Sequence, residues 1–358
     1  MANDIRVGVI GFGLAGKIFH AAVIAETPGL ELACIVQRKG DEAAKAYPSV
    51  KICRSIEEML GDKSIQLVVV ATPSASHFEH AVQCLKAGRN VMVDKPFTLT
   101  SDEAQQLIDE ARRQGVLVTA YQNRRWDGSF VTLKQVLASG VLGRVVSYTS
   151  HFDRFREAPR LDVWRENGGP GGGTLFDLGA HLIDQAGALF GDPESLWADV
   201  RIDREGAVVD DAFDILLKFD GLTVMLRATT IAAKPGPQFV VHGTNGSFVK
   251  WGLDPQEDAL KTGAKFSDAG FGEEPESQWG ELYVPGQPVR KIRTAAGDYR
   301  GIYANVRDAI LGTGKLEVTP EQAWRTTRLI ELTRQSSAEG RRLEFRRQGR
   351  RVEQYTSS

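Results

Sequence analysis

Residues 5–121 alternate short apolar runs with helical segments, and this alternation restricts the first third of the chain to one class of fold. The apolar runs predict strands at 5–10, 30–36, 65–71, 90–94 and 116–121. Helices are expected between and after them at about 15–26, 40–46, 55–60, 76–87 and 101–114. Each run is nearly all apolar, which is typical of strands covered on both faces of a parallel sheet. The pattern predicts an α/β domain with a doubly wound parallel sheet over residues 1–121.

The pattern changes after residue 121. A helix at about 127–138, a strand at 144–152 and a helix at 174–190 are followed by longer strands, which form hairpins at Asp220-Gly221 and around Thr244-Asn245-Gly246. We therefore expect residues 122–345 to form an α+β domain with an open, predominantly antiparallel sheet. Residues 254–290 lack periodicity and are expected to be a long surface loop. A last helix begins at Thr319-Pro320-Glu321-Gln322 and ends at Gly340, before a basic tail over 346–358.

The charge balance argues against polyanionic partners. The chain has 358 residues, with 44 basic and 46 acidic side chains. The six arginines of residues 341–358 could contact a polyanion, but sparse aromatic residues favour a solvated segment. Because the charges nearly balance, we expect no nucleic acid partner. No stretch of eighteen apolar residues occurs, so we expect no membrane partner either. Three widely spaced cysteines, Cys34, Cys53 and Cys84, favour a soluble protein of the reducing cytoplasm and no zinc site.

A glycine-rich turn follows the first predicted strand and opens a helix. Its sequence is Gly11-Phe12-Gly13-Leu14-Ala15-Gly16. In this strand–turn–helix context, the first glycine permits the tight turn, the second admits a pyrophosphate and the third lets helix and strand pack closely. The free N–H groups of the helix end suit a phosphate. The sequence therefore predicts a dinucleotide site here, although glycines can also serve a tight turn alone.

The end of the second strand bears on the choice of dinucleotide. An acid there would bind the ribose 2′-hydroxyl of NAD, but the sequence reads Gln37-Arg38-Lys39 and has no acid before Asp41. Arg38 can pair with a 2′-phosphate. We therefore expect NADP as the cofactor, with NAD possible; the alternative is a solvated basic loop beside a cofactor held by its other phosphates.

Two further strand ends meet the same edge of the predicted sheet, where ligands of open α/β sheets bind. Ala71, Thr72 and Pro73 follow one strand, and Asp94 and Lys95 follow the next. A lysine at this place can hydrogen-bond the nicotinamide ribose and also reach a substrate.

The helix at 174–190 carries a polar stripe opposite its leucines, formed by Asp177, His181 and Asp184. The i,i+4 spacing would let Asp177 touch the His181 imidazole and raise its basicity, which suits a general base. A histidine satisfied within the core is the alternative. A metal site on these three residues is less favoured because no further histidine or cysteine shares the segment.

The segments GFGLAG, ATPSASH, DKP and GGGTLFDLGAHLIDQ, in this order, resemble the glucose-fructose oxidoreductase/inositol dehydrogenase (Gfo/Idh/MocA) family. YQNRRWDGSF, the RFR and WRE stretches and WGLDPQEDAL resemble its NADP-dependent scyllo-inositol dehydrogenase-like branch. The resemblance implies a Rossmann domain, an open sheet domain and an active site between them. It implies catalysis by Lys95, Asp177 and His181, although Asp94 stands where the family usually has Glu.

We therefore expect an NADP-dependent oxidoreductase that transfers hydride to or from a carbon of a cyclitol, polyol or sugar. Alternatives are an aldose, ketosugar or other carbonyl reductase on the same scaffold, or a non-catalytic NADP-binding sensor. Besides the strand-end and glycine-turn residues, the expected cofactor contacts are His77, Asn123, Trp164 and Arg165. The expected substrate contacts are Lys95, Tyr121, Asp153, Arg154, Asp177 and His181, with no metal.

Assembly is expected through the second sheet. In the strand DAFDILLKF, Phe213, Ile215, Leu217 and Phe219 form one apolar face, while the opposite face is half apolar. Such a face usually needs a cover. The sequence, like the family resemblance, predicts a homodimer or homotetramer.

Overall fold

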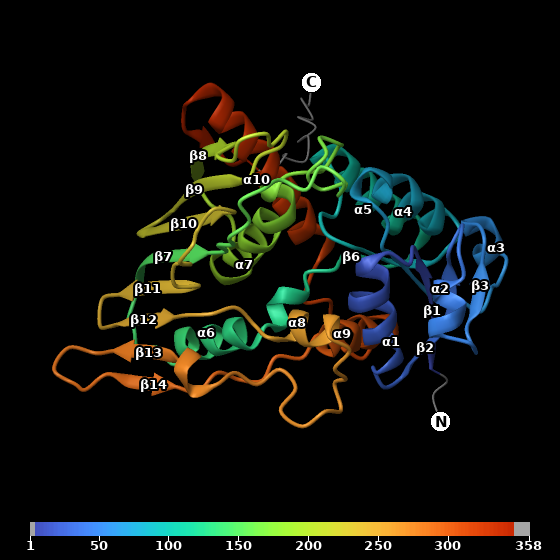
Figure 1. Cartoon of the computed structure of the whole chain (residues 1–358), viewed down its shortest axis with the longest axis horizontal. Helices are drawn as coiled ribbons and strands as arrows, with labels where there is room; N and C mark the ends of the chain where they lie inside the picture. The colour runs from blue at the N-terminus through green and yellow to red at the C-terminus, as the bar shows by residue number, and fades with distance from the viewer. Residues whose placement is uncertain (1–3, 347–358) are drawn as a thin grey trace, which may run out of the picture.

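Two β-sheets, each with its own helices, form the described part of the protein (Figure 1). The computed structural model describes residues 4–346. The first sheet has six parallel strands in the order β3-β2-β1-β4-β5-β6, and the second has nine strands in the order β14-β13-β12-β11-β7-β10-β9-β8-β15. In the second sheet the only parallel pair of the described strands is β7 with β10. The predicted fold class is confirmed.

The first sheet and its helices alternate along the chain. The strands are β1 (Ile5–Ile10), β2 (Leu30–Val36), β3 (Lys51–Cys53), β4 (Leu67–Val70), β5 (Asn90–Val93) and β6 (Val118–Ala120). The helices are a π-helical turn (Gly16–Ala21), α1 (Ala22–Ala25), α2 (Glu42–Ala46), α3 (Ile56–Leu60), α4 (His77–Lys86) and α5 (Ser101–Gln114). The strand β3 was not predicted, because only three residues form it and the first of them, Lys51, is exposed. It extends the sheet beside β2 at the edge.

The second part begins with a 3₁₀ turn at Asn123–Trp126. Its helices are α6 (Gly128–Ala138), a π-helical turn (Leu175–Gly179), α7 (Ala180–Phe190), α8 (Gln256–Lys261), α9 (Arg300–Ile310) and α10 (Pro320–Glu339). Its strands are β7 (Val145–His151), β8 (Ser195–Arg201), β9 (Ala212–Phe219), β10 (Leu222–Thr229), β11 (Phe239–Gly243), β12 (Ser247–Lys250), β13 (Gly280–Tyr283), β14 (Arg290–Ile292) and β15 (Leu343–Glu344).

Local sequence signals place several of these elements. Strands β9 and β10 pair antiparallel across a two-residue turn, in which Gly221 adopts a positive φ of 66°. The helix α10 begins with a capping box, in which Thr319 accepts a hydrogen bond from the Gln322 backbone N–H, and it ends at Gly340 in the left-handed region. Along β9, every second side chain is buried, as a sheet with one covered face requires.

The prediction of a long loop over residues 254–290 is wrong in part. The segment contains α8 and β13, and β14 begins at its end. Buried polar contacts hold it: the Asp254 carboxylate accepts hydrogen bonds from the backbone N–H groups of Gly128 (2.6 Å) and Gln256 (2.9 Å), and the Gln256 side chain accepts one from the Tyr299 N–H (2.8 Å). Such contacts leave no hydrophobic periodicity in the sequence. The predicted basic tail, apart from Arg346, lies outside the described residues.

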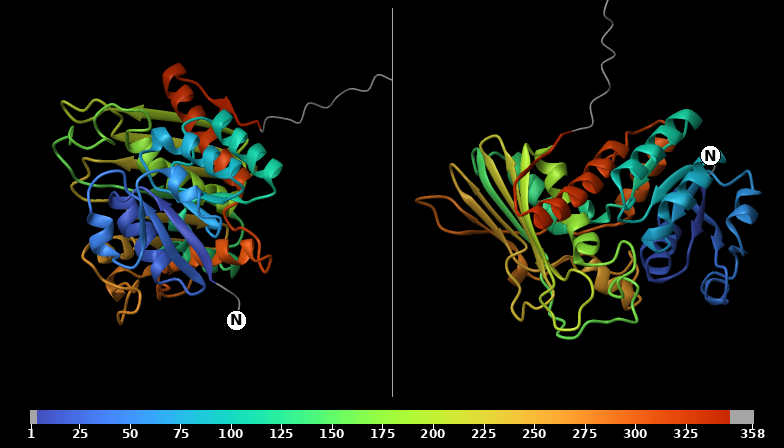
Figure 2. Two further views of the ribbon diagram at one scale, coloured as in Figure 1. Left: turned by 90° about the vertical axis from the view of Figure 1, so that its right-hand side faces the viewer. Right: turned by 90° about the horizontal axis from the view of Figure 1, so that it is seen from above.

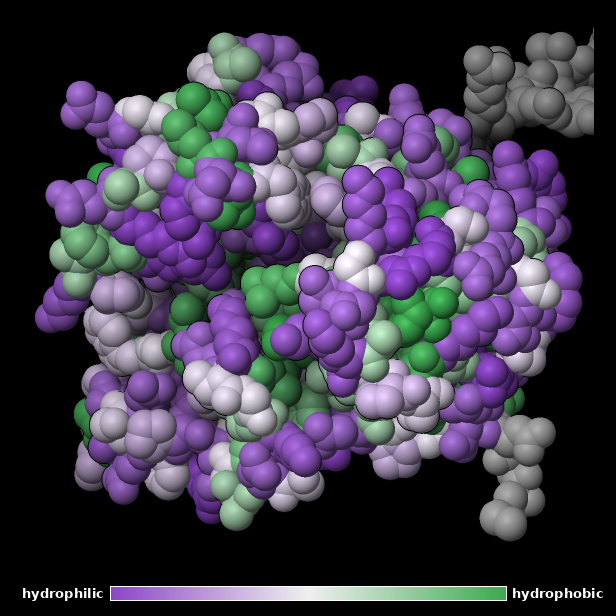
Figure 3. Space-filling view, turned by 45° about the vertical axis from the view of Figure 1, so that its right-hand side comes forward, coloured by the Kyte–Doolittle hydropathy of each residue, from purple (hydrophilic) through white to green (hydrophobic). Residues whose placement is uncertain are grey.

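The two parts lie side by side, with α10 between them (Figure 2). This helix packs against α5 and β6 of the first part and against α7 and β8 of the second. Figure 3 shows a mainly hydrophilic surface on one face, where hydrophobic residues are visible mostly in recesses. Lys95, which follows the carboxyl end of β5, donates a hydrogen bond to the Asp177 carbonyl oxygen in the turn that leads into α7, so distant segments of sequence meet at one site.

Candidate active site

The glycine-rich turn between β1 and the following helix has the shape of a dinucleotide cradle. Gly11 has a φ of 99°, and a Cβ atom on it would lie 2.7 Å from the Ala71 carbonyl oxygen. A Cβ on Gly16 would collide with the Gly11 carbonyl oxygen, whereas a Cβ on Gly13 would meet no protein atom within 4 Å. The first and third glycines are therefore required by the fold. The second leaves open space where a pyrophosphate could approach the backbone, so the residues fit a dinucleotide.

The end of β2 offers positive charge. Arg38 is exposed, and its side chain forms no hydrogen bond or ion pair within residues 4–346. The neighbouring Gln37 is occupied, because its side-chain oxygen accepts a hydrogen bond from the Ala43 N–H (2.9 Å) and its amide bonds Glu42. Arg54, which was not predicted, shapes this loop by donating to the carbonyl oxygens of Gln37 (2.9 Å) and Gly40 (2.8 Å).

His77 joins the ends of β4 and β5 from within the protein. Its Nδ1 and Nε2 each lie 2.8 Å from a backbone carbonyl oxygen, of Pro96 and Thr72 respectively, and its exposed fraction is 1%. Only a protonated ring could donate at both positions, but burial lowers the pKa of His77 despite the nearby Asp94 carboxylate. One of the two contacts at a time is therefore a hydrogen bond. This places His77 behind the strand ends, where it positions them, and its cofactor contact stays a prediction.

Asp94 is turned inward, toward a histidine that was not predicted. Its Oδ1 accepts a hydrogen bond from the Lys95 backbone N–H (2.8 Å) and lies 3.7 Å from His20 Nε2. Burial alone would raise the pKa of Asp94, but His20, His77 and Lys95 outweigh it and lower the pKa to about 2. The carboxylate therefore fixes the backbone that carries Lys95.

Tyr121 belongs to the packing beneath this edge. Its hydroxyl donates to the Phe19 carbonyl oxygen (2.7 Å), and its ring centroid lies 4.3 Å from that of His20. Tyr121 is buried and its hydroxyl is used, which gives it a packing role; its substrate contact stays a prediction.

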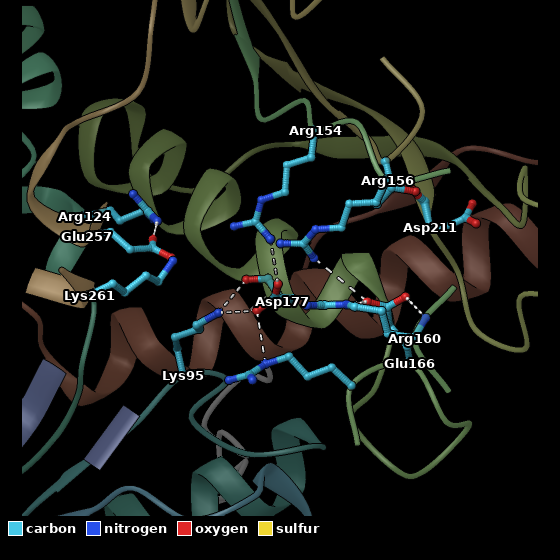
Figure 4. Close-up of polar contacts among 12 residues, drawn as sticks. Lys95, Arg124, Arg154, Arg156, Arg160, Glu166, Asp177, Asp211, Glu257 and Lys261 are labelled. Atoms are coloured by element: carbon cyan, nitrogen blue, oxygen red, sulfur yellow. Dashed lines mark hydrogen bonds and ion pairs between the residues drawn. The ribbon is translucent and has the colours of Figure 1, made fainter. Parts of the chain in front are cut away.

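Lys95 and Asp177 form the centre of the site (Figure 4). Lys95 Nζ donates to Asp177 Oδ1 at 2.8 Å and to the Asp177 carbonyl oxygen at 2.7 Å. Arg165 Nε lies 3.4 Å from Asp177 Oδ1, and Arg154 Nη1 lies 3.5 Å from Oδ2. Burial opposes ionisation of Asp177, but these three cations hold its pKa well below the usual range. Burial also lowers the pKa of Lys95, which Asp177 counteracts.

His181 lies in the same region as a nearly buried, neutral imidazole. Burial first, then the charges of Lys95 and Arg124, lower its pKa well below 6.5, and Asp177 opposes the shift. The predicted contact with Asp177 is wrong: the two residues form no hydrogen bond or ion pair, and His181 Nδ1 has no partner among the described residues. The three cations engage the carboxylate instead. His181 Nε2 forms no hydrogen bond within the described residues either and is not fully buried, so this nitrogen is suited to exchange a proton with a bound molecule.

Asp184 has a structural partner. Arg125 donates to it through Nε (2.7 Å) and Nη2 (2.7 Å), and both side chains are buried. Asp184 therefore does not join Asp177 and His181 in a metal site, and no group of three possible ligands occurs within residues 4–346.

The remaining predicted contacts differ in position. Asn123 begins the 3₁₀ turn after β6, and Trp164 lies under the Arg165 guanidinium, 4.6 Å from ring centroid to Cζ. Asp153 is used by the protein, since its Oδ2 accepts a hydrogen bond from the Gly236 N–H (2.9 Å) and lies 3.4 Å from His151 Nδ1. Asp153 therefore anchors the loop at Gly236, and its substrate contact stays a prediction. Arg156, which was not predicted, points toward the site beside Arg154 (Figure 4); their i,i+2 spacing in RFR was the available signal.

Comparison with known proteins agrees with this arrangement. The family model described as "Oxidoreductase family, NAD-binding Rossmann fold" matches residues 5–122. The companion model for the "C-terminal alpha/beta domain" matches residues 134–345. The chain belongs to the Gfo/Idh/MocA oxidoreductase family. It is therefore an oxidoreductase with a domain built to bind a nicotinamide cofactor.

Individual relatives of this Gfo/Idh/MocA protein span nearly the whole chain. The uncharacterized oxidoreductase YdgJ of Escherichia coli is 42% identical, covering 93% of this chain and 96% of its own. The scyllo-inositol 2-dehydrogenase (NADP(+)) IolW of Bacillus subtilis is 35% identical, covering 95% of each. The structure of yvaA from Bacillus subtilis, described as an oxidoreductase, has a TM-score of 0.93 and 34% identity, covering 97% of this chain and 99% of that one.

No helix within the described part of the chain combines the length and apolarity needed to cross a membrane.

Proposed function

We propose that this protein is an NADP-dependent oxidoreductase acting on a hydroxyl or carbonyl carbon of a cyclitol, polyol or sugar. The observation that carries the proposal is the meeting of Lys95, Asp177 and His181 at the carboxyl edge of a parallel sheet whose first turn is an open glycine cradle. Ligands of open α/β sheets bind at this edge. The name of the relative IolW supports both the substrate class and the cofactor.

When bound, the nicotinamide would accept or donate hydride. In the oxidative direction, we assign His181 as the general base that takes the hydroxyl proton, because its lowered pKa keeps it neutral near pH 7. Lys95 would stabilise the developing alkoxide, since its ammonium is fixed by two hydrogen bonds to Asp177. Asp177 is a positioning residue for Lys95 and balances the surrounding cations.

An activity assay of the native protein and of His181→Ala tests the assignment of His181 as the general base. With NADP⁺ and a panel of inositols and sugars, reduced cofactor should accumulate with at least one compound. His181→Ala should lower turnover by about 100- to 10,000-fold, as expected for the loss of general acid–base catalysis, with cofactor affinity nearly unchanged. The melting temperature should be measured on the same preparations. An active but thermally weakened His181→Ala protein would show that the histidine serves the core instead.

NADP is favoured over NAD by the exposed, unpaired Arg38 and the lack of an acid directly after β2. Glu42 comes close to this loop, but its carboxylate bonds the Gln37 amide. We expect NADPH to bind more tightly than NADH in a direct titration of the purified protein. Equal dissociation constants would overturn the preference and leave the oxidoreductase assignment intact.

A reductase of another class of carbonyl compound is the second candidate function. Relatives at 28–29% identity are named D-glucoside 3-dehydrogenase and trans-1,2-dihydrobenzene-1,2-diol dehydrogenase, so the family name alone does not fix the substrate. A reductase of another carbonyl compound would show turnover with NADPH and aldehydes or ketoses but none with cyclitols. A sensor without turnover is disfavoured by the unpaired His181 beside Lys95.

We also propose a homodimer or homotetramer that packs through the outer face of the second sheet. A row of residues in register crosses that face and is apolar except for Thr149: Trp197, Leu216, Met225, Thr149, Val240 and Val249. Trp197 is 40% exposed although it is large and apolar. A monomeric mass by light scattering at micromolar concentration would refute this assembly.

Two expectations from the sequence stay proposals. We place the boundary between the two domains after residue 121, where the parallel sheet ends. We place the protein in the cytoplasm on the basis of its three widely spaced cysteines.

A further inference from the structure

A strongly basic hollow adjoins Asp177 on the second part of the protein. The hollow measures about 30 Å³, and a water molecule needs roughly 10–15 Å³ of such space, so it admits about two oxygen atoms. Three carboxylates line it, those of Glu166, Asp177 and Asp210. Five arginines line it as well: Arg154, Arg156, Arg160, Arg165 and Arg204. The lining therefore carries two more positive than negative charges.

Each acid of the hollow is already paired with a cation, either in the lining or beside it. Asp177 is held by Lys95. Glu166 pairs with Arg160 at 2.8 Å and with Arg204 at 3.1 Å. Asp210 accepts hydrogen bonds from the Leu175 N–H (2.7 Å) and from Arg334 (3.0 Å), and Arg204 pairs with Asp211 just outside the lining. The excess of positive charge is thus not cancelled by the surroundings.

Arg154 and Arg156 have the longest ion-pair contacts of the five arginines. Arg154 lies 3.5 Å from Asp177, and the nearest acid to Arg156 is Glu166 at 3.9 Å. Burial and the like charges of Arg154 and Arg160 lower the pKa of Arg156, which shows that its neighbourhood repels it. A cation in this position is stabilised by an added anion.

The backbone holds these two arginines in place. Arg154 N–H donates to the Thr229 carbonyl oxygen (2.9 Å), and Arg156 N–H donates to that of Thr230 (2.7 Å), so the segment runs extended beside the end of β10. Side chains two residues apart on an extended segment share a face. Phe155 accordingly points the other way and is 58% exposed, while both guanidinium groups reach toward Asp177 (Figure 4).

The location assigns the hollow to the substrate rather than to the cofactor. All of its lining residues lie between 154 and 230, and none comes from the parallel-sheet part that carries the glycine cradle. It nevertheless touches Asp177, which contacts Lys95 on its other side. An anionic group bound here would therefore sit next to the reacting carbon of a molecule held by Lys95 and His181.

We propose that the substrate carries an anionic group, a carboxylate or a phosphate ester, which Arg154 and Arg156 bind in this hollow. The proposal rests on the proposed function, because it names the class of polyol or sugar that the site accepts: an acidic one. Guanidinium groups bind both carboxylate and phosphate through paired hydrogen bonds, so the shared chemistry is that of an oxyanion.

The test compares three probes that differ in charge. D-glucuronate, D-glucose 6-phosphate and D-glucose are titrated by calorimetry into the full-length protein saturated with NADP⁺, and the same compounds are assayed for reduction of NADP⁺. One of the two acidic probes should bind at least tenfold more tightly than glucose, and the probe that does so identifies carboxylate or phosphate. High salt should weaken this binding.

Arg156 is the informative position, because it does not touch Asp177. Arg156→Gln should weaken binding of the preferred acidic probe by about 10- to 100-fold, the range for losing a hydrogen bond to a charged group. Arg156→Lys should lose less affinity for the acidic probe. Arg342→Gln, which replaces an exposed arginine between α10 and β15, is the control and should bind the probe as the native protein does. The dissociation constant of NADP⁺ should be the same in all four proteins.

Three results would overturn the proposal. They are equal affinities for glucose and both acidic probes, an Arg156→Gln protein that binds the acidic probe like the native one, and an Arg156→Gln protein that binds NADP⁺ more weakly. The last would assign the arginine to the cofactor. Absence of NADP⁺ reduction with any compound would instead count against the proposed function, while the calorimetric arm would still decide whether the hollow binds anions.

Discussion

Replacing Lys95 separates its two roles, stabilising charge on the substrate and setting the protonation of His181. Lys95→Met keeps the length of the side chain and removes the ammonium. The group is 14% exposed and is fixed by hydrogen bonds of 2.8 and 2.7 Å to Asp177, so it acts in a largely dry and preorganised position. Loss of one such donor costs about 100- to 1,000-fold in turnover, or about 2.7–4 kcal/mol of transition-state stabilisation.

The same variant should move the pH profile in a defined direction. Lys95 is among the charges that lower the pKa of His181, and Asp177 opposes them. Oxidation needs the neutral imidazole, so the rate should fall at low pH as His181 becomes protonated. In the native protein this acidic limb of the pH–rate profile should lie below pH 6.5. Without Lys95 the pKa of His181 rises, and the limb moves up toward neutrality. In Asp177→Asn the pKa falls further, and the limb moves down.

The assay is the initial rate of NADP⁺ reduction between pH 5 and 9 at saturating cofactor, with the melting temperature recorded for each protein. Lys86→Met, at the exposed end of α4, serves as a control for removing a lysine charge and should behave as the native protein. Limbs that move in the same direction in Lys95→Met and Asp177→Asn, or that do not move, would refute the electrostatic account of His181.

Three further predictions concern the cofactor cradle, the end of β2 and the core. Gly13→Ala should leave the melting temperature nearly unchanged and weaken NADP(H) binding, because its Cβ would enter only the open space, whereas Gly16→Ala should destabilise the fold by a collision with backbone; thermal melts and cofactor titration distinguish them. Arg38→Ala should weaken NADPH by about 1.5–3 kcal/mol and leave NADH unaffected in the same titration. Asp184→Asn should cost roughly 3–5 kcal/mol in denaturant unfolding, since it removes the carboxylate paired with the buried Arg125 and leaves that cation with neutral acceptors; a loss under 1 kcal/mol would contradict this.

Hydrophobic periodicity and turn residues were enough to predict most of the fold. The apolar strands of the parallel sheet, the Asp220-Gly221 hairpin and the caps of α10 are local signals, and the structure confirms them. The strands and helix within residues 254–290 escaped prediction because buried hydrogen bonds of Asp254 and Gln256 hold that segment, and such contacts are not visible as a pattern in the chain.

The site was predictable where a residue type and its place in an element agreed, and not where a partner came from elsewhere. Lys95 at a strand end and Asp177 on the polar stripe were both identified, and they do meet. Asp177 was expected to orient His181, but its partners Arg154 and Arg165 come from a loop that precedes it by up to 23 residues. Helical spacing shows that His181 is near Asp177 in the helix. It cannot show whether the Asp177 carboxylate binds this neighbour or cations from another segment.

Those cations also explain how one site can combine a neutral base with a basic surrounding. Burial lowers the pKa of His181, and the charges of Lys95, Arg124 and Arg154 lower it further, so Arg154, which would attract an acidic substrate, also helps to keep the imidazole unprotonated. An anion bound at Arg154 and Arg156 would reverse part of this effect and raise the pKa of His181. Binding an acidic substrate would therefore make the imidazole more basic before the substrate hydroxyl loses its proton. This favours the proton transfer from that hydroxyl to His181 that accompanies hydride loss.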